Sequence, residues 1–255
     1  MLADDGTTRR KTASSHAMKG RAVRRWFRWL LVVGGVAMGA VGLLFASLEA
    51  FYRYQLAQLP ELPRMGDAPV SLPLVTRVMT AHLGGTALQV QPVLPWSLPV
   101  TRRRNAQLPD GGFTLAYAAA GEWLRRFDLP AQPTHWRRQA LAVWLTRHAS
   151  AEQLLAQWSS TVKLPRAAPG LGNASLSYFG RPLETLEVSE VAVLIGSALG
   201  PISFDALCRH DLAMKARNRV LHSLQRTGGL GDEEATRLMG QPVGLAPASP
   251  DEPCR

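Results

Sequence analysis

The sequence predicts a mainly helical protein with a single transmembrane helix near its N-terminus. The first observation is an uncharged run of 19 residues, from Leu30 to Leu48. The second is that apolar side chains from residue 111 onward recur at helix-compatible spacings and almost nowhere alternate as in a strand. With 255 residues and 46% hydrophobic content, the chain is long and apolar enough for one sizeable domain with its own core.

The uncharged run has the length of a membrane-spanning helix. As a helix it rises about 28 Å, which is close to the hydrocarbon thickness of a bilayer. Trp26 and Trp29 precede it and Tyr52 follows it, where amphipathic rings favour the membrane interface. The alternative is a cleaved signal peptide, whose apolar region is usually about 7 to 15 residues long. We therefore interpret residues 29–51 as a retained anchor.

The net charge of +10 is concentrated at one end of the chain. Residues 1–28 hold eight basic and two acidic residues, whereas the part from residue 52 onward holds 21 basic and 16 acidic residues. Basic residues beside a transmembrane helix stay on the cytoplasmic side, so we expect a cytoplasmic tail and a body across the membrane. This placement of the arginines indicates the membrane as a partner and argues against nucleic acid.

The body is expected to comprise a Pro-rich juxtamembrane segment, a helical domain and a Pro-rich tail, over residues 52–110, 111–245 and 246–255. Within the domain we expect helices throughout 111–163, a loop at 164–172, and further helices at 174–178, 189–199 and 212–224. Predicted N-caps are Thr134, Ser150 (paired with Gln153) and Ser189, and Gly200-Pro201 is predicted to end a helix.

The two cysteines, Cys208 and Cys254, both fall on the outer side of the predicted anchor. In an oxidising compartment they are expected to pair and to tether the C-terminal tail. Neither has a histidine at metal-ligand spacing, so the sequence predicts no metal site and no cofactor. The scattered histidines are expected to be surface or hydrogen-bonded residues: His82, His135, His148, His210 and His222.

A series of spaced motifs in the second half of the chain resembles one family closely. They are Ala174-Ser175-x-x-Tyr178-Phe179-Gly180-Arg181-Pro182, then Leu186, Glu190, Leu194 and Pro201, and then Ala216-Arg217-Asn218-x-Val220-Leu221. This order and spacing is similar to the peptidoglycan glycosyltransferase domain, glycosyltransferase family 51, of class A penicillin-binding proteins and monofunctional transglycosylases. The resemblance covers about residues 111–247 and is strongest from 174 to 224.

The resemblance implies a lysozyme-like, all-helical domain that takes the membrane lipid II, an undecaprenyl-pyrophosphoryl disaccharide-peptide. In the family a first Glu, in an E-D-x-x-F motif, is the general base. A GGST-x-TQQ loop and an RK-x-x-E helix bind the pyrophosphate, and that helix carries a second Glu; some members use a divalent metal. The residues that correspond to the pyrophosphate site here are Gly111, Gly112, Thr114, Arg137 and Arg138.

The sequence departs from the family pattern at both acidic positions. No Asp or Glu occurs between Asp67 and Asp110, and the first Glu is expected near Thr80. No Glu occurs between Glu122 and Glu152, and no acid of either kind in residues 129–151, where the second Glu is expected near Arg138 or Gln139. Threonine does not accept a proton near neutral pH, and arginine stays charged. We therefore assign no catalytic residue.

Four acids near these windows are the candidates for a substitute base, and two of them, Asp67 and Asp128, have no further feature that singles them out. Asp110 directly precedes the glycine pair, but Leu-Pro-Asp-Gly-Gly is ordinary turn chemistry. Glu122 has Arg125 and Arg126 at spacings where ion pairs form on a helix surface.

These observations predict a membrane-anchored, transglycosylase-like protein that has lost glycosyl transfer. It would act as a binding or scaffolding factor in cell-wall assembly, in the bacterial inner membrane, with its main domain periplasmic. Its expected partners are the membrane, lipid II or glycan strands, and other cell-wall synthesis proteins. The alternative is an active glycosyltransferase that polymerises lipid II, so whether the chain is an enzyme stays open.

Overall fold

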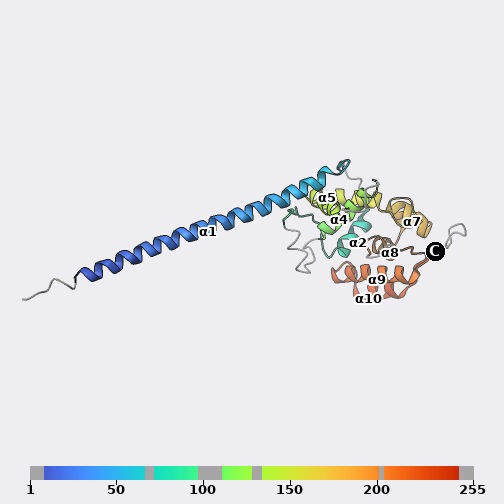
Figure 1. Ribbon diagram of the computed structural model, residues 1–255. Helices are drawn as coiled ribbons and strands as arrows, with labels where there is room; N and C mark the ends of the chain where they lie inside the picture. Colours follow the sequence, from blue (N-terminus) through green and yellow to red (C-terminus); the bar gives the residue numbers. More distant parts are fainter. Residues whose placement is uncertain (1–8, 67–71, 97–110, 128–133, 201–203, 247–255) are drawn as a thin grey trace, which may run out of the picture. The chain divides into compact units, whose positions relative to one another are not determined.

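The computed structural model describes residues 9–66, 72–96, 111–127, 134–200 and 204–246 (Figure 1). The chain separates into two compact units, Met1–Phe51 and Tyr52–Arg255. The described residues are mainly helical, which confirms the predicted fold class. Their one isolated β-bridge joins Gln89 to Gly111.

The first unit consists of a single long helix in its described part. Helix α1 spans Arg9–Ala57, so it extends beyond the predicted anchor at both ends. Its segment Arg28–Ala57 is long and apolar enough to cross a membrane, judged by length and composition. The apolar side chains of this segment, such as Leu31 and Met38, are largely exposed, as expected of a surface that meets lipid.

The second unit is built from short helices joined by loops. After the end of α1 they are α2 (Pro73–His82), α4 (Gly112–Leu124), α5 (Thr134–His148), α6 (Ala151–Thr161), α7 (Leu171–Phe179), η1 (Leu183–Thr185), α8 (Val188–Ala198), α9 (His210–Arg226) and α10 (Asp232–Gly240). Helix α4 packs on α5 and α6, whereas α9 packs on α2, α8 and α10. In Figure 1, α2 and α8 lie between α4 and α5 (green) and α9 and α10 (orange).

One continuous hydrophobic core joins these helices. Its fully buried side chains come from distant parts of the chain and include Met79, Leu115, Trp158, Ile195 and Leu221. Burying each such side chain stabilises the fold by about 1.5–3 kcal/mol. Because α2 contributes to this core, part of the segment interpreted as juxtamembrane is packed within the second unit.

Local sequence signals explain several helix boundaries. Pro73 begins α2, where a missing backbone N–H costs nothing. The predicted capping box of Ser150 and Gln153 is confirmed, with each side chain bonded to the other's backbone N–H at 3.2 and 2.9 Å. Helix α5 begins at Thr134 as predicted, although the side chain of Thr134 lies outside the described part.

Other boundaries differ from the sequence-based expectation. Ser189 does not cap α8, which begins at Val188 because the Glu190 carboxylate accepts the backbone N–H of Glu187 at 2.8 Å. Helix α7 begins at Leu171, within the predicted loop. Helix α10 was not anticipated, although three acidic residues at its start match the helix dipole: Asp232, Glu233 and Glu234.

Candidate functional site

A cavity of about 420 Å³ lies where five helices of the second unit meet. The C-terminal ends of α2 and α8, the face of α4, and side chains from α5 and α6 form its walls. Its lining residues include charged, polar and aromatic side chains: His82, Thr114, Tyr117, Glu122, Arg125, Arg138 and Trp158. Such a mixed, partly enclosed cavity is the default candidate for a ligand site.

The glycine pair at the start of α4 forms one edge of this cavity. Gly111 has a left-handed backbone (φ of 63°), and a β-carbon there would collide with Leu83. A β-carbon on Gly112 would collide with the backbone of Gln89. Both glycines are therefore required by close packing, and of the two only Gly111 lines the cavity, together with the exposed Thr114.

Arg138 extends from α5 into the cavity wall. Its Nε donates to the backbone oxygen of Tyr117 at 2.9 Å, and its guanidinium lies 3.9 Å from the centre of the Tyr117 ring. Burial lowers the pKa of this guanidinium, which nevertheless stays charged near neutral pH. Neither terminal nitrogen has a hydrogen-bond partner among the described residues. The cavity thus contains an arginine with free donors, which suits an anion.

Arg137, the other predicted arginine, does not line the cavity. It is buried, and its Nε and Nη2 donate to Oε1 of Gln58 at 3.2 and 2.7 Å. Gln58 follows the end of α1, so Arg137 ties α5 to that segment. The structure therefore separates Arg137 and Gly112 from Gly111, Thr114 and Arg138, which meet around the cavity.

Glu122 is the cavity's carboxylate, and sequence reasoning placed it on the surface. The predicted ion pair with Arg125 forms at 2.7 Å, but the Glu122 side chain is only 6% exposed. Burial raises the pKa of this carboxyl, opposed by Arg125, the backbone N–H of Lys163, and Arg138. Arg126 instead lies over the Trp123 ring, 4.6 Å from its centre.

His82 is a further cavity residue that sequence reasoning missed. It ends α2, and its Nδ1 is enclosed without a hydrogen-bond partner in the described part of the chain. Burial, and then the nearby charge of Arg219, lower the pKa of the imidazole. His82 was expected to be a surface or hydrogen-bonded residue; it is half-buried in the cavity wall, and the lowered pKa favours its neutral form.

The positions expected to carry the family's two acids hold no proton acceptor. Thr80 is buried, and its hydroxyl donates to the backbone oxygen of Thr76 at 2.7 Å. Near the second position, Arg138 lines the cavity with a guanidinium, and Gln139 carries an amide whose Nε2 lies 3.1 Å from Nε2 of His135. Among the described residues that line the cavity, Glu122 is the sole carboxylate.

The other three candidate acids, Asp67, Asp110 and Asp128, lie outside the described residues. Within the described ranges no group of three His, Cys, Asp or Glu side chains is arranged to hold a metal ion.

The motif-rich stretch around residues 175–190 holds loops together away from the cavity lining. The Arg181 guanidinium pairs with the Glu190 carboxylate, and the Ser175 hydroxyl donates to the backbone oxygen of Arg181. Glu190 also accepts the N–H at the start of α8. The residues that most resemble the family in this stretch therefore have a structural role here.

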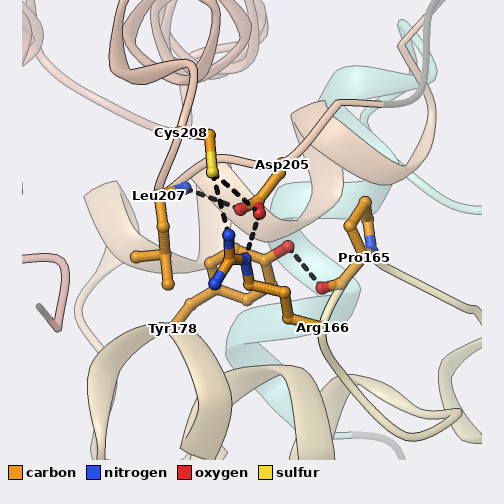
Figure 2. Close-up of polar contacts among 6 residues, drawn as sticks. All are labelled: Pro165, Arg166, Tyr178, Asp205, Leu207 and Cys208. Carbon is orange, nitrogen blue, oxygen red and sulfur yellow. Dashed lines mark hydrogen bonds and ion pairs between the residues drawn. The ribbon is translucent and has the colours of Figure 1, made fainter. Parts of the chain in front are cut away.

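A second polar cluster surrounds Cys208 (Figure 2). Arg166 forms an ion pair with Asp205, and its Nη2 donates to the Cys208 sulfur at 3.0 Å. Tyr178 closes the cluster by donating to the backbone oxygen of Pro165 at 2.6 Å. Cys208 is disulfide-bonded, so its 3.1 Å approach to Asp205 is not a donated hydrogen bond. The predicted partner, Cys254, lies outside the described residues, so that pairing stays a prediction.

The structure thus has a helical domain with a cavity lined by charged and aromatic side chains, in a chain that also has an apolar helix of membrane length. Residues 105–225 match the family model described as Transglycosylase. Penicillin-binding protein 1B of Escherichia coli is 29% identical over 131 residues, which cover 49% of this chain and 16% of that protein. Penicillin-binding protein 1A of the same organism is 24% identical over 236 residues, which cover 80% of this chain and 27% of that protein.

This chain thus carries a transglycosylase-family domain, and it spans only about a sixth to a quarter of the length of these relatives. A solved structure of penicillin-binding protein 1A from Haemophilus influenzae is also similar, with 18% identity over 51% of this chain and 17% of that chain. Its TM-score of 0.34 is too low to establish a shared arrangement of helices.

Proposed function

We propose that this protein is a membrane-anchored, transglycosylase-like binding factor that no longer transfers glycosyl groups. Its ligand would be lipid II or the end of a glycan strand that still carries the lipid pyrophosphate. It would hold this ligand for other proteins of cell-wall assembly. The single observation that carries the proposal is Arg138, a charged and partly desolvated residue of the cavity wall whose terminal nitrogens have no hydrogen-bond partner among the described residues.

The other cavity groups suit a pyrophosphate. Backbone N–H groups at the start of α4 attract anions because they have no partner within the helix. Gly111 and Thr114 lie at this end, and Thr114 adds a hydroxyl. Arg125 supplies a second positive charge, which its ion pair with Glu122 offsets, so the charge of Arg138 is left in excess. The balance of charge in the cavity therefore favours an anion over a cation.

The loss of glycosyl transfer is supported by what stands in place of the acids. Removing a positioned general base typically slows a reaction about 10²- to 10⁴-fold. The Thr80 hydroxyl is engaged with its own helix, and Arg138 and Gln139 carry no carboxylate, so none of these residues replaces the missing acids. An arginine near the leaving pyrophosphate would stabilise bound ligand without providing the proton acceptor that the sugar hydroxyl needs.

Glu122 favours a second candidate function, that of an active glycosyltransferase with a relocated acid. A carboxyl whose pKa is raised by burial is suited to proton transfer near neutral pH. Against this, Arg125 donates a hydrogen bond to the Glu122 carboxylate at 2.7 Å, and this bond makes the carboxylate less available to accept a proton from a substrate. Glycan formation that is lost in Glu122→Gln would establish this second function.

The direct test uses the full-length protein in detergent with labelled lipid II, scored separately for binding and for glycan chain length. We expect binding without chain formation, and a 10- to 100-fold weaker affinity in Arg138→Ala, since one charge-assisted contact contributes about 1.5–3 kcal/mol. Arg126→Ala is the matched control. Arg126 lies just after α4 and contacts an aromatic ring, as Arg138 does, but it does not line the cavity. Equal affinities in all three proteins would exclude the site.

Two further parts of the proposal have their own tests. A reporter enzyme fused after residue 255 should be active only if that end is periplasmic, as the positive-inside rule predicts for this anchor. Lipid II binding should be unaffected by a chelator, because the proposed contacts come from protein side chains and backbone. A cytoplasmic reporter signal would reverse the topology, and chelator-sensitive binding would require a metal.

A further inference from the structure

Gly121 stands in an unusual place, in the middle of the alanine-rich helix α4. The residues before it are Ala118, Ala119 and Ala120, all good helix formers. Glycine is the poorest helix former after proline, so an alanine at this position would serve the helix better. The presence of glycine calls for a reason outside the helix itself.

The reason lies in the Arg138 guanidinium. A β-carbon on residue 121 would lie 2.6 Å from Cζ, 2.7 Å from Nη2 and 2.8 Å from Nε of Arg138. Real contacts of a β-carbon do not become this short, so a side chain at residue 121 and the present position of Arg138 exclude each other. The guanidinium rests on the bare backbone of Gly121.

Tyr117 completes this resting place. Residues 117 and 121 are one turn apart and share a face of α4. The Tyr117 ring lies under the guanidinium at 3.9 Å from its centre, and the Tyr117 backbone oxygen accepts Nε–H at 2.9 Å. Together, Tyr117 and Gly121 form what we call the arginine seat, which uses Nε and leaves both terminal nitrogens without a hydrogen-bond partner among the described residues.

We infer that Gly121 is a positioning residue, whose missing side chain is what admits Arg138 to the cavity as an anion-binding group. The inference rests on the proposed function for its ligand, a pyrophosphate group. It differs from an ordinary packing role because the colliding atoms belong to the far end of a flexible side chain. That end can move away without shifting any backbone, although it then loses its Nε bond and its ring contact with Tyr117, whereas a collision with backbone strains the fold itself.

Gly196 illustrates the contrast. A β-carbon there would lie 2.7 Å from the backbone oxygen of Ala216, so Gly196 sets the distance between α8 and α9. Substitution at Gly196 is expected to strain the fold. Substitution at Gly121 is expected to leave the fold intact and to expel one functional group.

The experiment compares Gly121→Ala, Arg138→Ala and the double variant with the wild-type full-length chain in detergent. Inorganic pyrophosphate and lipid II are used as separate probes, so that free and lipid-linked pyrophosphate are distinguished. We expect Gly121→Ala to weaken Arg138-dependent binding at least tenfold, and the double variant to bind no more weakly than Arg138→Ala alone. Gly172→Ala is the control, because a β-carbon on that helical glycine meets nothing within 4 Å.

A second readout needs no ligand. With Arg138 in place, the benefit of alanine to the helix is offset by the displaced guanidinium. Gly121→Ala should therefore raise the unfolding midpoint more in the Arg138→Ala background than in the wild-type background. Wild-type affinity in Gly121→Ala, or equal midpoint shifts in both backgrounds, would overturn the inference. If the wild-type chain binds neither probe, the proposed function is wrong. The comparison of unfolding midpoints then still tests whether the Gly121 position determines where Arg138 lies.

Discussion

Two arginines of the second unit, Arg217 on α9 and Arg138 on α5, have different hydrogen-bonding roles. Arg217, on α9, is 2% exposed, and every nitrogen group has an acceptor. Its Nη1 and Nη2 each donate at 2.6 Å to the backbone oxygens of Gln241 and Met239, and its Nε donates at 2.9 Å to Asn218. Arg138 is half-buried, uses only Nε, and leaves its terminal nitrogens to the cavity.

The two arginines differ in what they contribute: Arg217 stabilises the fold, whereas Arg138 is available to bind a ligand. Carbonyls at the C-terminus of a helix lack partners within the helix, and Arg217 satisfies those at the end of α10. An arginine whose donors are all used by the protein has none left for a ligand. Arg217 also belongs to the stretch that most resembles the family, so that resemblance marks the parts that hold the fold, whereas the cavity is where the sequence departs.

The largest expected effect is on stability, in Arg217→Met. This change removes three hydrogen bonds of a charged, buried donor, and we expect it to lower the free energy of unfolding by about 2–4 kcal/mol. Chemical unfolding of the detergent-solubilised chain, followed by tryptophan fluorescence, measures it. Pyrophosphate affinity of the folded protein should stay within about twofold. A selective loss of affinity with normal stability would reverse the roles of the two arginines.

The conservative change Arg138→Lys should lower the affinity for pyrophosphate and leave the stability of the fold nearly unchanged. It keeps the charge but loses the planar fork and the Nε bond to Tyr117, so we expect pyrophosphate to bind about tenfold more weakly. The free energy of unfolding should change by less than about 1 kcal/mol, because no other described residue depends on the terminal nitrogens. Titration calorimetry at fixed salt concentration measures the affinity. Full retention of affinity would mean that any positive charge suffices there.

Glu122→Gln tests the contribution of charge near Arg138 to anion binding. It removes the negative charge from the cavity, so pyrophosphate should bind several-fold, up to about tenfold, more tightly at pH 7. Because burial raises the pKa of Glu122, the folded protein holds this proton more firmly, and wild-type stability falls as pH rises above the ordinary value of 4.5. This decline should disappear in Glu122→Gln. The exposed Glu184→Gln is the control, and an unchanged pH profile in Glu122→Gln would contradict the assignment.

The smallest effect is expected from His82→Gln. The pKa of His82 is lowered, so the unfolded chain takes up this proton first as pH falls through the ordinary value of 6.5. Wild-type stability should therefore decrease on acidification below pH 6.5, and His82→Gln should remove a part of that decrease of about 1 kcal/mol or less. Unfolding midpoints at pH 5.5 and 7.5 measure it, and His222→Gln serves as an exposed control. Parallel profiles would show that His82 is not buried as described.

The sequence predicts much of the fold because its signals are local. The uncharged run, the alanine-rich stretch before Glu122 and the Ser150 capping box each depend on neighbours in the chain. Helix α10 was missed because its short apolar pattern gains stability only by packing on α9.

The site was predictable only in part. Gly111, Thr114 and Arg138 meet at the cavity, but Arg137 turns to Gln58, and spacing along a helix does not tell which neighbour an arginine will find. The burial of Glu122 and of His82 depends on helices far away in the chain, so no local pattern reports it. The glycine within the alanine-rich helix α4, Gly121, is visible in the sequence, but the reason for it can be given only once the position of Arg138 is known.

The arginine seat has a consequence for the history of the protein. A mutation that adds a side chain at residue 121 removes the benefit of Arg138, and once Arg138 has been lost, glycine at residue 121 is only a burden on the helix. Neither position is then free to drift alone, so the two should have been inherited and lost together. In related chains, glycine at the equivalent of 121 would accompany arginine at the equivalent of 138 where the anion site was kept under selection. Alanine paired with an uncharged residue would mark lineages in which selection preserved only the scaffold.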